Sequence, residues 1–180
     1  MTDKEILSLI KEDVNKGFRI LVKTYGKPIY WHIRKIVYNH YDADDITQNV
    51  FIKVFQNSDS FKGESSLKTW IYRIATNESI NFLNSAAQKK NVGNEELVLQ
   101  LSSNLQDDNF FEGDEIQLKL QQAIATLPEK QRIVFMMKYF DDMKYEEMSK
   151  VLDTSVGALK ASYHHATKKI EEILLKNVEK

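Results

Sequence analysis

The sequence predicts an all-α protein made of two small helical domains joined by an acidic flexible linker. Apolar residues recur at steps of three and four along stretches on both sides of that linker, which is the spacing of amphipathic helices. No segment of the N-terminal half alternates with the period of two expected of a half-buried strand. The 180 residues include only six Gly and two Pro, and a chain with many turns needs more of both.

Charge divides the chain into three parts, although its formal net charge is only −1. Residues 1–90 carry a net +4 and residues 116–180 a net +2, whereas residues 91–115 contain seven acidic and no basic side chains. The acidic part is also rich in Asn, Gln and Ser, a composition typical of linkers. The low net charge is therefore an average over unlike segments and does not exclude a nucleic-acid partner.

These shifts in composition predict three segments. We expect an N-terminal domain over residues 1–88, a linker over 89–114 and a C-terminal domain over 115–180. A short helical piece is expected in the linker around Glu95–Leu101. A flexible segment of about 25 residues has an r.m.s. span of roughly 25–30 Å, enough to let two domains engage separate sites on one partner. An ordinary packed loop is the alternative for this stretch.

The N-terminal block contains four predicted helices. The first runs along the apolar positions from Leu7 to Tyr25 and ends at Gly26, and the second opens at Pro28 and continues to about Tyr38. Asp42 is a good N-cap for the third helix. A polar break over residues 57–65 precedes the fourth helix, which we expect from about 66 to 85.

The C-terminal block has the outline of a helix-turn-helix. Two helices joined by a three-residue turn, with the second helix longer, are typical of this motif. Two further helices precede it, the second of them opened by Pro128. The four helices and the turn are predicted at about Glu115–Thr126, 128–139, Tyr145–Leu152, 153–155 and Val156–Leu175.

Several classes of chemistry are excluded or unsupported. The chain has no Cys, so it has no disulfide, no thiolate metal site and no Cys nucleophile. His164 and His165 point about 100° apart on a helix and cannot readily chelate one ion, and the pair Asp44–Asp45 lies where a helix starts, where carboxylates are common. We predict no metal, no cofactor and no catalytic residue.

The N-terminus is too charged for a signal peptide, and no apolar run approaches the length of a membrane helix. We therefore expect a cytoplasmic protein without membrane insertion.

The final helix has two distinct faces. An apolar stripe that includes Leu159 and Tyr163 predicts the buried side, which favours a core role for Tyr163. The opposite face is small, polar or basic close to the helix N-terminus, where a recognition helix touches base edges. A solvated helix face with ordinary lysines is the alternative. The residues of this face are Ala158, Lys160, Ala161, Ser162, His165 and Lys168, with Ser155 as the N-cap.

The stretch from Phe61 to Asn81 combines aromatic rings, cations and amides around a polar Gly-Ser loop. Rings stack on unpaired bases, amides read base edges and cations follow phosphates, so this mixture suits single-stranded nucleic acid. A loop of Gly and Ser can enclose one flipped base. Trp70 also lies on the apolar stripe of its helix, so a core role for that ring remains open.

The order of these features resembles the sigma factors of bacterial RNA polymerase, specifically their small two-domain extracytoplasmic-function (ECF) group. The resemblance covers nearly the whole chain. The segment Asp42–Phe55 is similar to the helix that docks on the clamp coiled coil of the largest polymerase subunit, and Phe61–Ala75 to the loop and helix that melt and read the −10 element. Leu127–Arg132 opens what resembles the C-terminal domain, whose helix-turn-helix for the −35 element is matched by Tyr145–Met148 and Gly157–Lys160.

The resemblance implies a role for each matched residue. The melted −10 strand would be bound by Lys62, Ser65, Ser66, Lys68, Trp70, Arg73 and Asn77. Core-polymerase docking would use Asp45, Gln48, Phe51 and Lys53, with Phe55 packing beneath. The −35 duplex would be contacted by Ser155, Ala158, Lys160, Ser162, His165 and Lys168. The turn of the helix-turn-helix has Asp153 where the family often has Gly, and Asp tolerates a left-handed backbone better than most residues.

The implied function is promoter-specific transcription initiation without enzymatic activity of the chain itself. The implied partners are core RNA polymerase and promoter DNA, and many relatives are held inactive by an anti-sigma protein. Two other functions remain as alternatives: a helix-turn-helix regulator with a helical sensing or dimerisation domain, and a helical adaptor that binds only protein. Neither alternative explains the aromatic and basic segment from Phe61 to Arg73.

Overall fold

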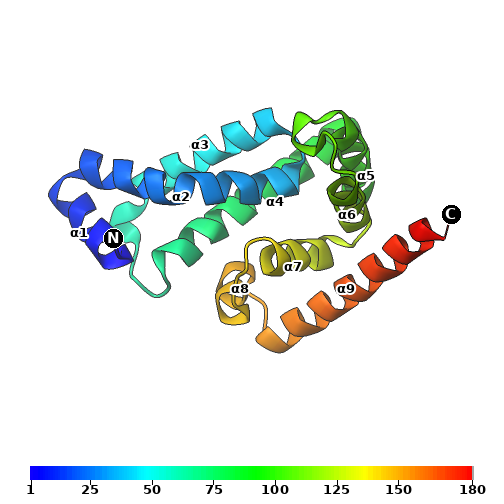
Figure 1. The fold of residues 1–180 in the computed structure, drawn as a ribbon. Coiled ribbons are helices and arrows are strands. Elements are labelled where there is room, and N and C mark those ends of the chain that lie inside the picture. The colour runs from blue at the N-terminus through cyan, green and yellow to red at the C-terminus, as the bar shows by residue number, and fades with distance from the viewer. Residues whose placement is uncertain (180) are drawn as a thin grey trace.

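The computed structural model describes residues 1–179, except for the side chain of Phe110. The described chain is helical and contains no β-strand. Figure 1 shows α2, α3 and α4 as long neighbouring helices, with α5 and α6 at one end and α7 to α9 lying beneath them. The α-helices are α1 Asp3–Glu12, α2 Val14–Val37, α3 His40–Gln56, α4 Leu67–Lys90, α5 Asn94–Ser103, α6 Glu115–Ala125, α7 Glu129–Tyr139, α8 Tyr145–Leu152 and α9 Val156–Val178.

The first two helices do not have the predicted boundary. The chain breaks at Asp13, whose side chain accepts a hydrogen bond from the Lys16 amide and caps α2. Gly17 lets α1 cross α2 closely, because a Cβ there would lie 2.5 Å from the backbone nitrogen of Ile10. Pro28 lies inside α2 rather than opening a helix. The expected helix from Leu7 to Tyr25 and the boundary at Gly26 are therefore wrong.

The other two helices of the N-terminal bundle also begin or end differently from the prediction. Asn39, not Asp42, caps α3 by accepting from the amides of Tyr41 and Asp42. Ser66 caps α4, so that this helix begins at Leu67, within one residue of the predicted start. However, α4 continues five residues past the predicted end and stops at Asn91, which adopts the left-handed conformation.

The acidic stretch contains more regular structure than a flexible linker would. The expected short helix is present as α5, and two 3-10 turns follow it, η2 Asn104–Asp107 and η3 Asn109–Phe111. Leu97, Val98 and Leu105 are buried. The difference has a physical cause, because α5, which carries Leu97 and Val98, packs against α4 and α6.

The C-terminal helices lie close to their predicted positions. The turn between α8 and α9 is set by Asp153 at φ 51° and by Ser155, whose side chain accepts from the Ala158 amide. Leu159, Ala166 and Ile170 of α9 are buried, as the apolar stripe predicts. Tyr163 stacks on Phe135 with ring centroids 5.7 Å apart and is half-buried.

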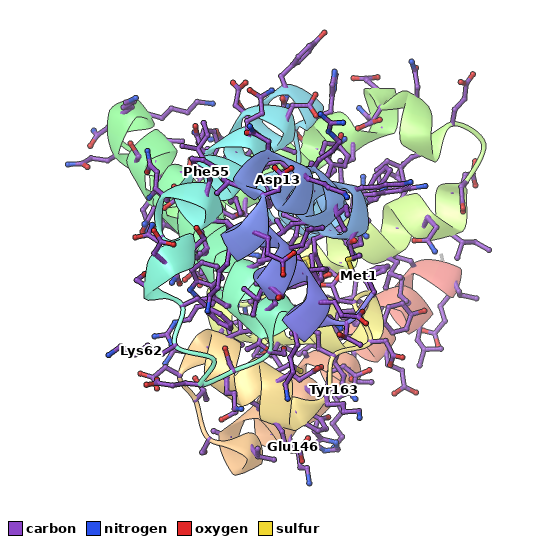
Figure 2. The ribbon with its side chains drawn as sticks, turned by 90° about the vertical axis from the view of Figure 1, so that its left-hand side faces the viewer. Met1, Asp13, Phe55, Lys62, Glu146 and Tyr163 are labelled. Carbon is purple, nitrogen blue, oxygen red and sulfur yellow. The ribbon has the colours of Figure 1, made fainter. Side chains whose placement is uncertain are left out.

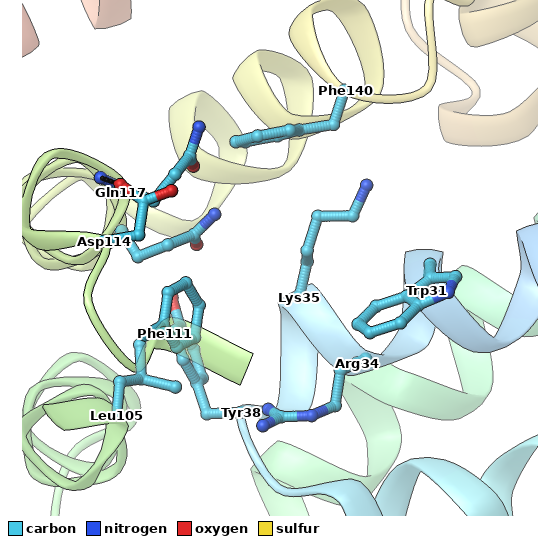
Figure 3. A pocket seen from close by; sticks show the side chains of 10 residues that line it. Trp31, Arg34, Lys35, Tyr38, Leu105, Phe111, Asp114, Gln117 and Phe140 are labelled. Carbon is cyan, nitrogen blue, oxygen red and sulfur yellow. Dashed lines mark hydrogen bonds between the residues drawn. The ribbon is translucent and has the colours of Figure 1, made fainter. Parts of the chain in front are cut away.

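The C-terminal helices pack against the N-terminal bundle. Helix α8 crosses α4, and α7 touches α2. Beside this seam lies a cavity of about 400 Å³ between α2, the linker and α6–α7. Figure 3 shows Lys35 reaching toward the Phe140 ring, 4.7 Å from its centroid, with Phe111 and Tyr38 at the linker end of the cavity. The Tyr38 hydroxyl is buried without a hydrogen-bond partner in the described part of the chain, and burial raises the pKa of Tyr38 to about 12.

Candidate nucleic-acid interfaces and docking face

The loop before α4 and the first turns of that helix bring most of the predicted −10 residues together. Lys62, Ser65, Trp70 and Arg73 line one hollow of about 520 Å³. The Trp70 ring is half-buried and lies against Phe61, with centroids 4.9 Å apart. The Trp70 side chain thus packs against the core and also lines the hollow, so its predicted contact with DNA stays a prediction.

Two lysines of the predicted −10 set differ in their surroundings. Lys62 is exposed and stands in the loop beside Gly63, which has a φ of +72°. Figure 2 shows Lys62 at the bend of this loop, on the side of the molecule that carries the C-terminal helices. The Lys68 ammonium lies 5.8 Å from the centroid of the Tyr72 ring, which is a cation–π distance.

Ser66 has a structural role that the resemblance does not predict. Its hydroxyl oxygen accepts from the Thr69 amide at 3.1 Å and donates to the Thr69 hydroxyl at 2.8 Å. The hydroxyl group is therefore committed to capping α4. Ser66 positions the helix that carries the other predicted −10 residues.

Asp3 is a positioning residue that the sequence did not identify. One carboxylate oxygen accepts from the Leu67 amide at 2.9 Å, and the other accepts from the Tyr25 hydroxyl at 2.7 Å. An acidic group at the start of a helix is favoured by the helix dipole. Asp3 thus ties α1 and α2 to the beginning of α4. The contact spans 64 residues, so no local pattern could reveal it.

The predicted docking residues on α3 do not share one face. Asp45 and Gln48 are exposed, whereas Lys53 forms an ion pair with Glu78 of α4. Phe51 is only 6% exposed and packs on Phe18, with ring centroids 6.4 Å apart.

Phe55 is 46% exposed. The expected order is thus wrong: Phe51 lies beneath, and Phe55 is at the surface. Both rings lie against Phe18 of α2, and the packing of the two helices leaves Phe51 inside.

Three exposed apolar residues complete the surface around Asp45 and Gln48. They are Tyr41, Ile52 and Phe55, which are 70%, 52% and 46% exposed. With Asp45 and Gln48 they recur at steps of three and four, so they form one stripe along α3. We name these five residues the α3 stripe. Asp45 and Gln48 of this stripe were predicted as docking residues, whereas the sequence pattern gave Tyr41 and Ile52 no role. A shallow groove between α2 and α3, lined by Gln48 and Ile52, adjoins it.

The predicted −35 residues are spread around the free side of α9. Ala158, His165 and Lys168 are exposed. Lys160 and Ser162 are two positions apart, about 200° around the helix, and lie at opposite rims of this face. Lys160 approaches the Tyr145 ring at 5.7 Å, and Ser162 lines a hollow shared with α4. Ser155 is the N-cap, so its hydroxyl is engaged by the Ala158 amide.

A buried charged cluster joins the two halves of the chain. Asp141, in the turn after α7, accepts from His32 Nδ1 at 2.7 Å and from Lys35 Nζ at 3.1 Å. The side chains of His32 and Asp141 are 2% and 6% exposed. Burial alone would raise the pKa of the Asp141 carboxyl, but His32 and Lys35 together hold that pKa below its usual value. The other ring nitrogen of His32 lies 2.8 Å from the Thr76 hydroxyl.

The local sequence around Asp141 indicates only a polar turn. Its partners are more than 100 positions away, so no local pattern points to the cluster.

Two segments of the chain match regions of one known family. Residues 21–89 match sigma-70 region 2, and residues 117–170 match sigma-70 region 4. The chain belongs to the sigma-70 family, in its ECF group. The two matched segments contain the predicted −10 and −35 residues in the order expected from the sequence.

Similar proteins extend over almost the full length of the chain. The ECF RNA polymerase sigma factor SigW of Bacillus subtilis is 29% identical, over 97% of this chain and 97% of that protein. The solved structure of CnrH in complex with the cytosolic domain of CnrY aligns with a TM-score of 0.71 at 18% identity, over 96% of each chain. That of the sigma factor RpoE in complex with the anti-sigma factor NepR from Bartonella quintana aligns with a TM-score of 0.69 at 18% identity, over 88% of this chain and 97% of that chain.

Within residues 1–179, none of the helices combines the length and apolar character that crossing a bilayer requires.

Proposed function

We propose that this protein is an ECF sigma factor that binds core RNA polymerase and directs transcription initiation at specific promoters. The observation that carries the proposal is the presence of sigma-70 regions 2 and 4 in one chain, with an aromatic and basic loop before α4 in the first and a helix-turn-helix in the second. The chain contributes binding and no catalysis, because RNA synthesis is the chemistry of the polymerase. It acts where the polymerase acts, in the cytoplasm.

The N-terminal domain, over residues 1–88, reads the −10 element. Lys62, Lys68 and Arg73 neutralise phosphates of the unpaired strand, and the open side of Trp70 stacks on a base. Asn77 lies one helical turn beyond Arg73 and offers both a donor and an acceptor to a base edge. Ser65 lines the same hollow as Lys62. Binding of unpaired bases favours the melted promoter, because bases that are still paired and stacked in the duplex cannot enter this hollow.

The C-terminal domain, over residues 115–180, reads the −35 element through the free face of α9. Ala158 permits close approach of the helix to a base edge, and His165 can donate to one. Lys160 and Lys168 contact phosphates on the two sides of the groove. Residues 89–114 join the two domains. The α3 stripe, with Asp45 and Gln48 at its polar positions, docks on the clamp coiled coil of the largest polymerase subunit.

Run-off transcription with purified core polymerase tests the proposal. The template pool should contain the promoter regions next to the gene for this protein and next to candidate target genes. We expect discrete transcripts that require both the protein and the polymerase. A helix-turn-helix regulator would instead bind duplex DNA alone and would not bind the polymerase. Absence of both transcription and polymerase binding would refute the proposed function.

A further inference from the structure

We propose that Asp3 is a positioning residue for promoter melting, because it ties helix α1 to the start of α4 and so fixes the loop and turns that carry the proposed −10 readers. The inference rests on the proposed function for the role of that surface. It adds to that function a part of the chain that the family match does not include. Residues 21–89 match sigma-70 region 2, whereas α1 covers Asp3–Glu12.

The two carboxylate oxygens of Asp3 have partners on two different helices. One accepts from the Leu67 amide of α4 at 2.9 Å, and the other accepts from the Tyr25 hydroxyl of α2 at 2.7 Å. Burial, and then the hydrogen bond to Asp3, raise the pKa of Tyr25, so its hydroxyl remains a proton donor at neutral pH. Figure 1 shows α1 next to the loop that leads into α4. Asp3 thus joins three helices at one point.

The position of Asp3 is fixed within α1. Thr2 and Glu5 form a capping box, in which the Glu5 amide donates to the Thr2 hydroxyl and the Thr2 amide donates to the Glu5 carboxylate. Because these two residues cap α1, the Asp3 side chain in the same turn is available to reach α4. Ile6 is fully buried and Ile10 is 7% exposed. Their burial holds α1, and Asp3 with it, against the bundle.

The start of α4 is held from two directions. The Ser66 hydroxyl accepts from the Thr69 amide within the helix, and Asp3 accepts from the Leu67 amide from outside it. Two of the four amides that a helix N-terminus leaves without an intrahelical partner are therefore satisfied. The Leu67 side chain is 1% exposed and anchors the same turn in the core. Without Asp3, this turn would keep its own cap but lose its tie to α1 and α2.

Proposed −10 readers flank this point on both sides. A binding constellation works only while its groups are held within about 0.5 Å of the productive geometry. A small shift of the first turn of α4 would therefore misplace several readers at once relative to an unpaired strand. The readers nearest to this turn are Lys62 and Ser65 in the loop before it, and Lys68, Trp70 and Arg73 in the two turns that follow.

Helix α2 connects the Asp3 contact to the proposed docking surface. Val22 and Gly26 of α2 line the groove between α2 and α3 that adjoins the α3 stripe, and Tyr25 lies between them in the chain. A polymerase bound at that surface holds α2, and Asp3 relates this fixed position to the start of α4. Docking itself uses neither of the Asp3 contacts. Loss of Asp3 should therefore slow promoter melting without weakening polymerase binding.

The test uses three variants of the full chain. Asp3→Ala removes both contacts and the charge. Asp3→Asn removes the charge but keeps the shape, and its amide can accept from the Leu67 amide and donate to the Tyr25 oxygen. Glu12→Ala is the matched control, because Glu12 is an exposed acidic residue of the same helix whose hydrogen bond, from Ser8, stays within α1.

The first measurement separates promoter opening from polymerase binding. Opening is followed at saturating polymerase with a 2-aminopurine base in the −10 element of a promoter found by run-off transcription. We expect Asp3→Ala to open the promoter about tenfold more slowly, the scale of one hydrogen bond to a charged group, with wild-type polymerase affinity. Asp3→Asn should stay within about threefold of wild type because it can keep both contacts. Glu12→Ala should match wild type.

The second measurement needs neither polymerase nor DNA. Hydrogen–deuterium exchange of the free chain reports how often the first turn of α4 opens. Its amides should exchange faster in Asp3→Ala than in wild type and Glu12→Ala. Circular dichroism should show wild-type helix content in all variants. If Asp3→Ala unfolds, Tyr25→Phe decides by the same two measurements, because it removes one contact and should show a smaller change in the same direction.

Wild-type opening by Asp3→Ala, or an equal loss of opening and of polymerase affinity, would overturn the positioning role. So would an Asp3→Asn protein as slow as Asp3→Ala, because the charge and not the hydrogen bonds would then matter. The proposed function fails separately, if the wild-type chain neither binds polymerase nor supports transcription. Faster exchange at α4 in Asp3→Ala would then retain the tie between α1 and α4 without a role in melting.

Discussion

Replacement of Gly17 by Ala should destabilise the N-terminal domain, although the same change in an ordinary helix is stabilising. Ala is favoured over Gly inside a helix by about 1 kcal/mol. At position 17, however, the new Cβ would lie 2.5 Å from Ile10 N and 2.6 Å from Ile10 Cα. These are backbone atoms, so α1 must move away from α2.

The cost follows from what α1 buries. Ile6 is fully buried and Ile10 is 7% exposed, and full burial of such a side chain contributes about 1.5–3 kcal/mol. Loss of much of this burial, less the gain in helix propensity, gives a net destabilisation of about 2–4 kcal/mol. That corresponds to a fall in Tm of roughly 5–15 °C for a chain of this size.

Gly26→Ala is the matched control, because Gly26 lies in the same helix. Its added Cβ would meet only Val22 Cγ1 at 3.7 Å, which is ordinary contact. We expect a stabilisation of about 0.5–1 kcal/mol. Urea unfolding followed by Trp fluorescence suits both variants, since both Trp residues, at positions 31 and 70, are in the N-terminal domain. A Gly17→Ala protein as stable as Gly26→Ala would refute the close-crossing argument.

Three further predictions concern the DNA-reading surfaces. Lys68→Ala combined with Arg73→Ala should slow promoter opening about tenfold or more, while polymerase affinity in a pull-down stays at the wild-type value; equal loss of both would contradict the −10 assignment. Lys160→Ala and Lys168→Ala, measured in the polymerase-bound protein on duplex DNA, should each lower the slope of log K against log salt by about 1; unchanged slopes would place these lysines off the DNA. Asp153→Gly should stabilise the C-terminal domain by about 1 kcal/mol, because φ is +51° there; thermal unfolding measures this, and a lower Tm would contradict it.

Local signals predicted the C-terminal helices well. Ser155 and the turn at Asp153 mark the start of α9 by short-range hydrogen bonding and backbone conformation alone. Helix α8 ends where the turn begins for the same reason. Such elements can be predicted from sequence because their causes lie within four residues of the boundary.

The N-terminal bundle shows what local patterns miss. The break at Asp13 interrupts an apolar stripe that looks continuous, and it is stabilised by the packing of α1 across Gly17. Pro28 is accommodated inside α2, although Pro usually marks a boundary. Phe51 and Phe55 are both apolar and one turn apart, so only the packed bundle decides which of them is buried.

The candidate sites also include features that the local sequence indicates and features that it misses. The stretch from Phe61 to Asn77 was identified from its composition, because aromatic and basic residues rarely mix in this way within a core. The roles of Asp3 and Asp141 were not identified, since their partners are 22 to 109 positions away in the sequence. Long-range polar contacts leave no periodic signal in either segment.

The position of the α3 stripe has a consequence for the order of assembly. Helices α7 to α9 lie beneath α2 and α4 and leave α3 on the far side (Figure 1). Tyr41, Ile52 and Phe55 are therefore exposed while α7 to α9 pack against the N-terminal bundle. Binding at this proposed docking surface does not require the C-terminal helices to move first, so any rearrangement of them follows the encounter, as in induced fit. Stopped-flow measurements at rising polymerase concentration should then show an observed rate that increases and, where such a rearrangement follows, levels off at its rate.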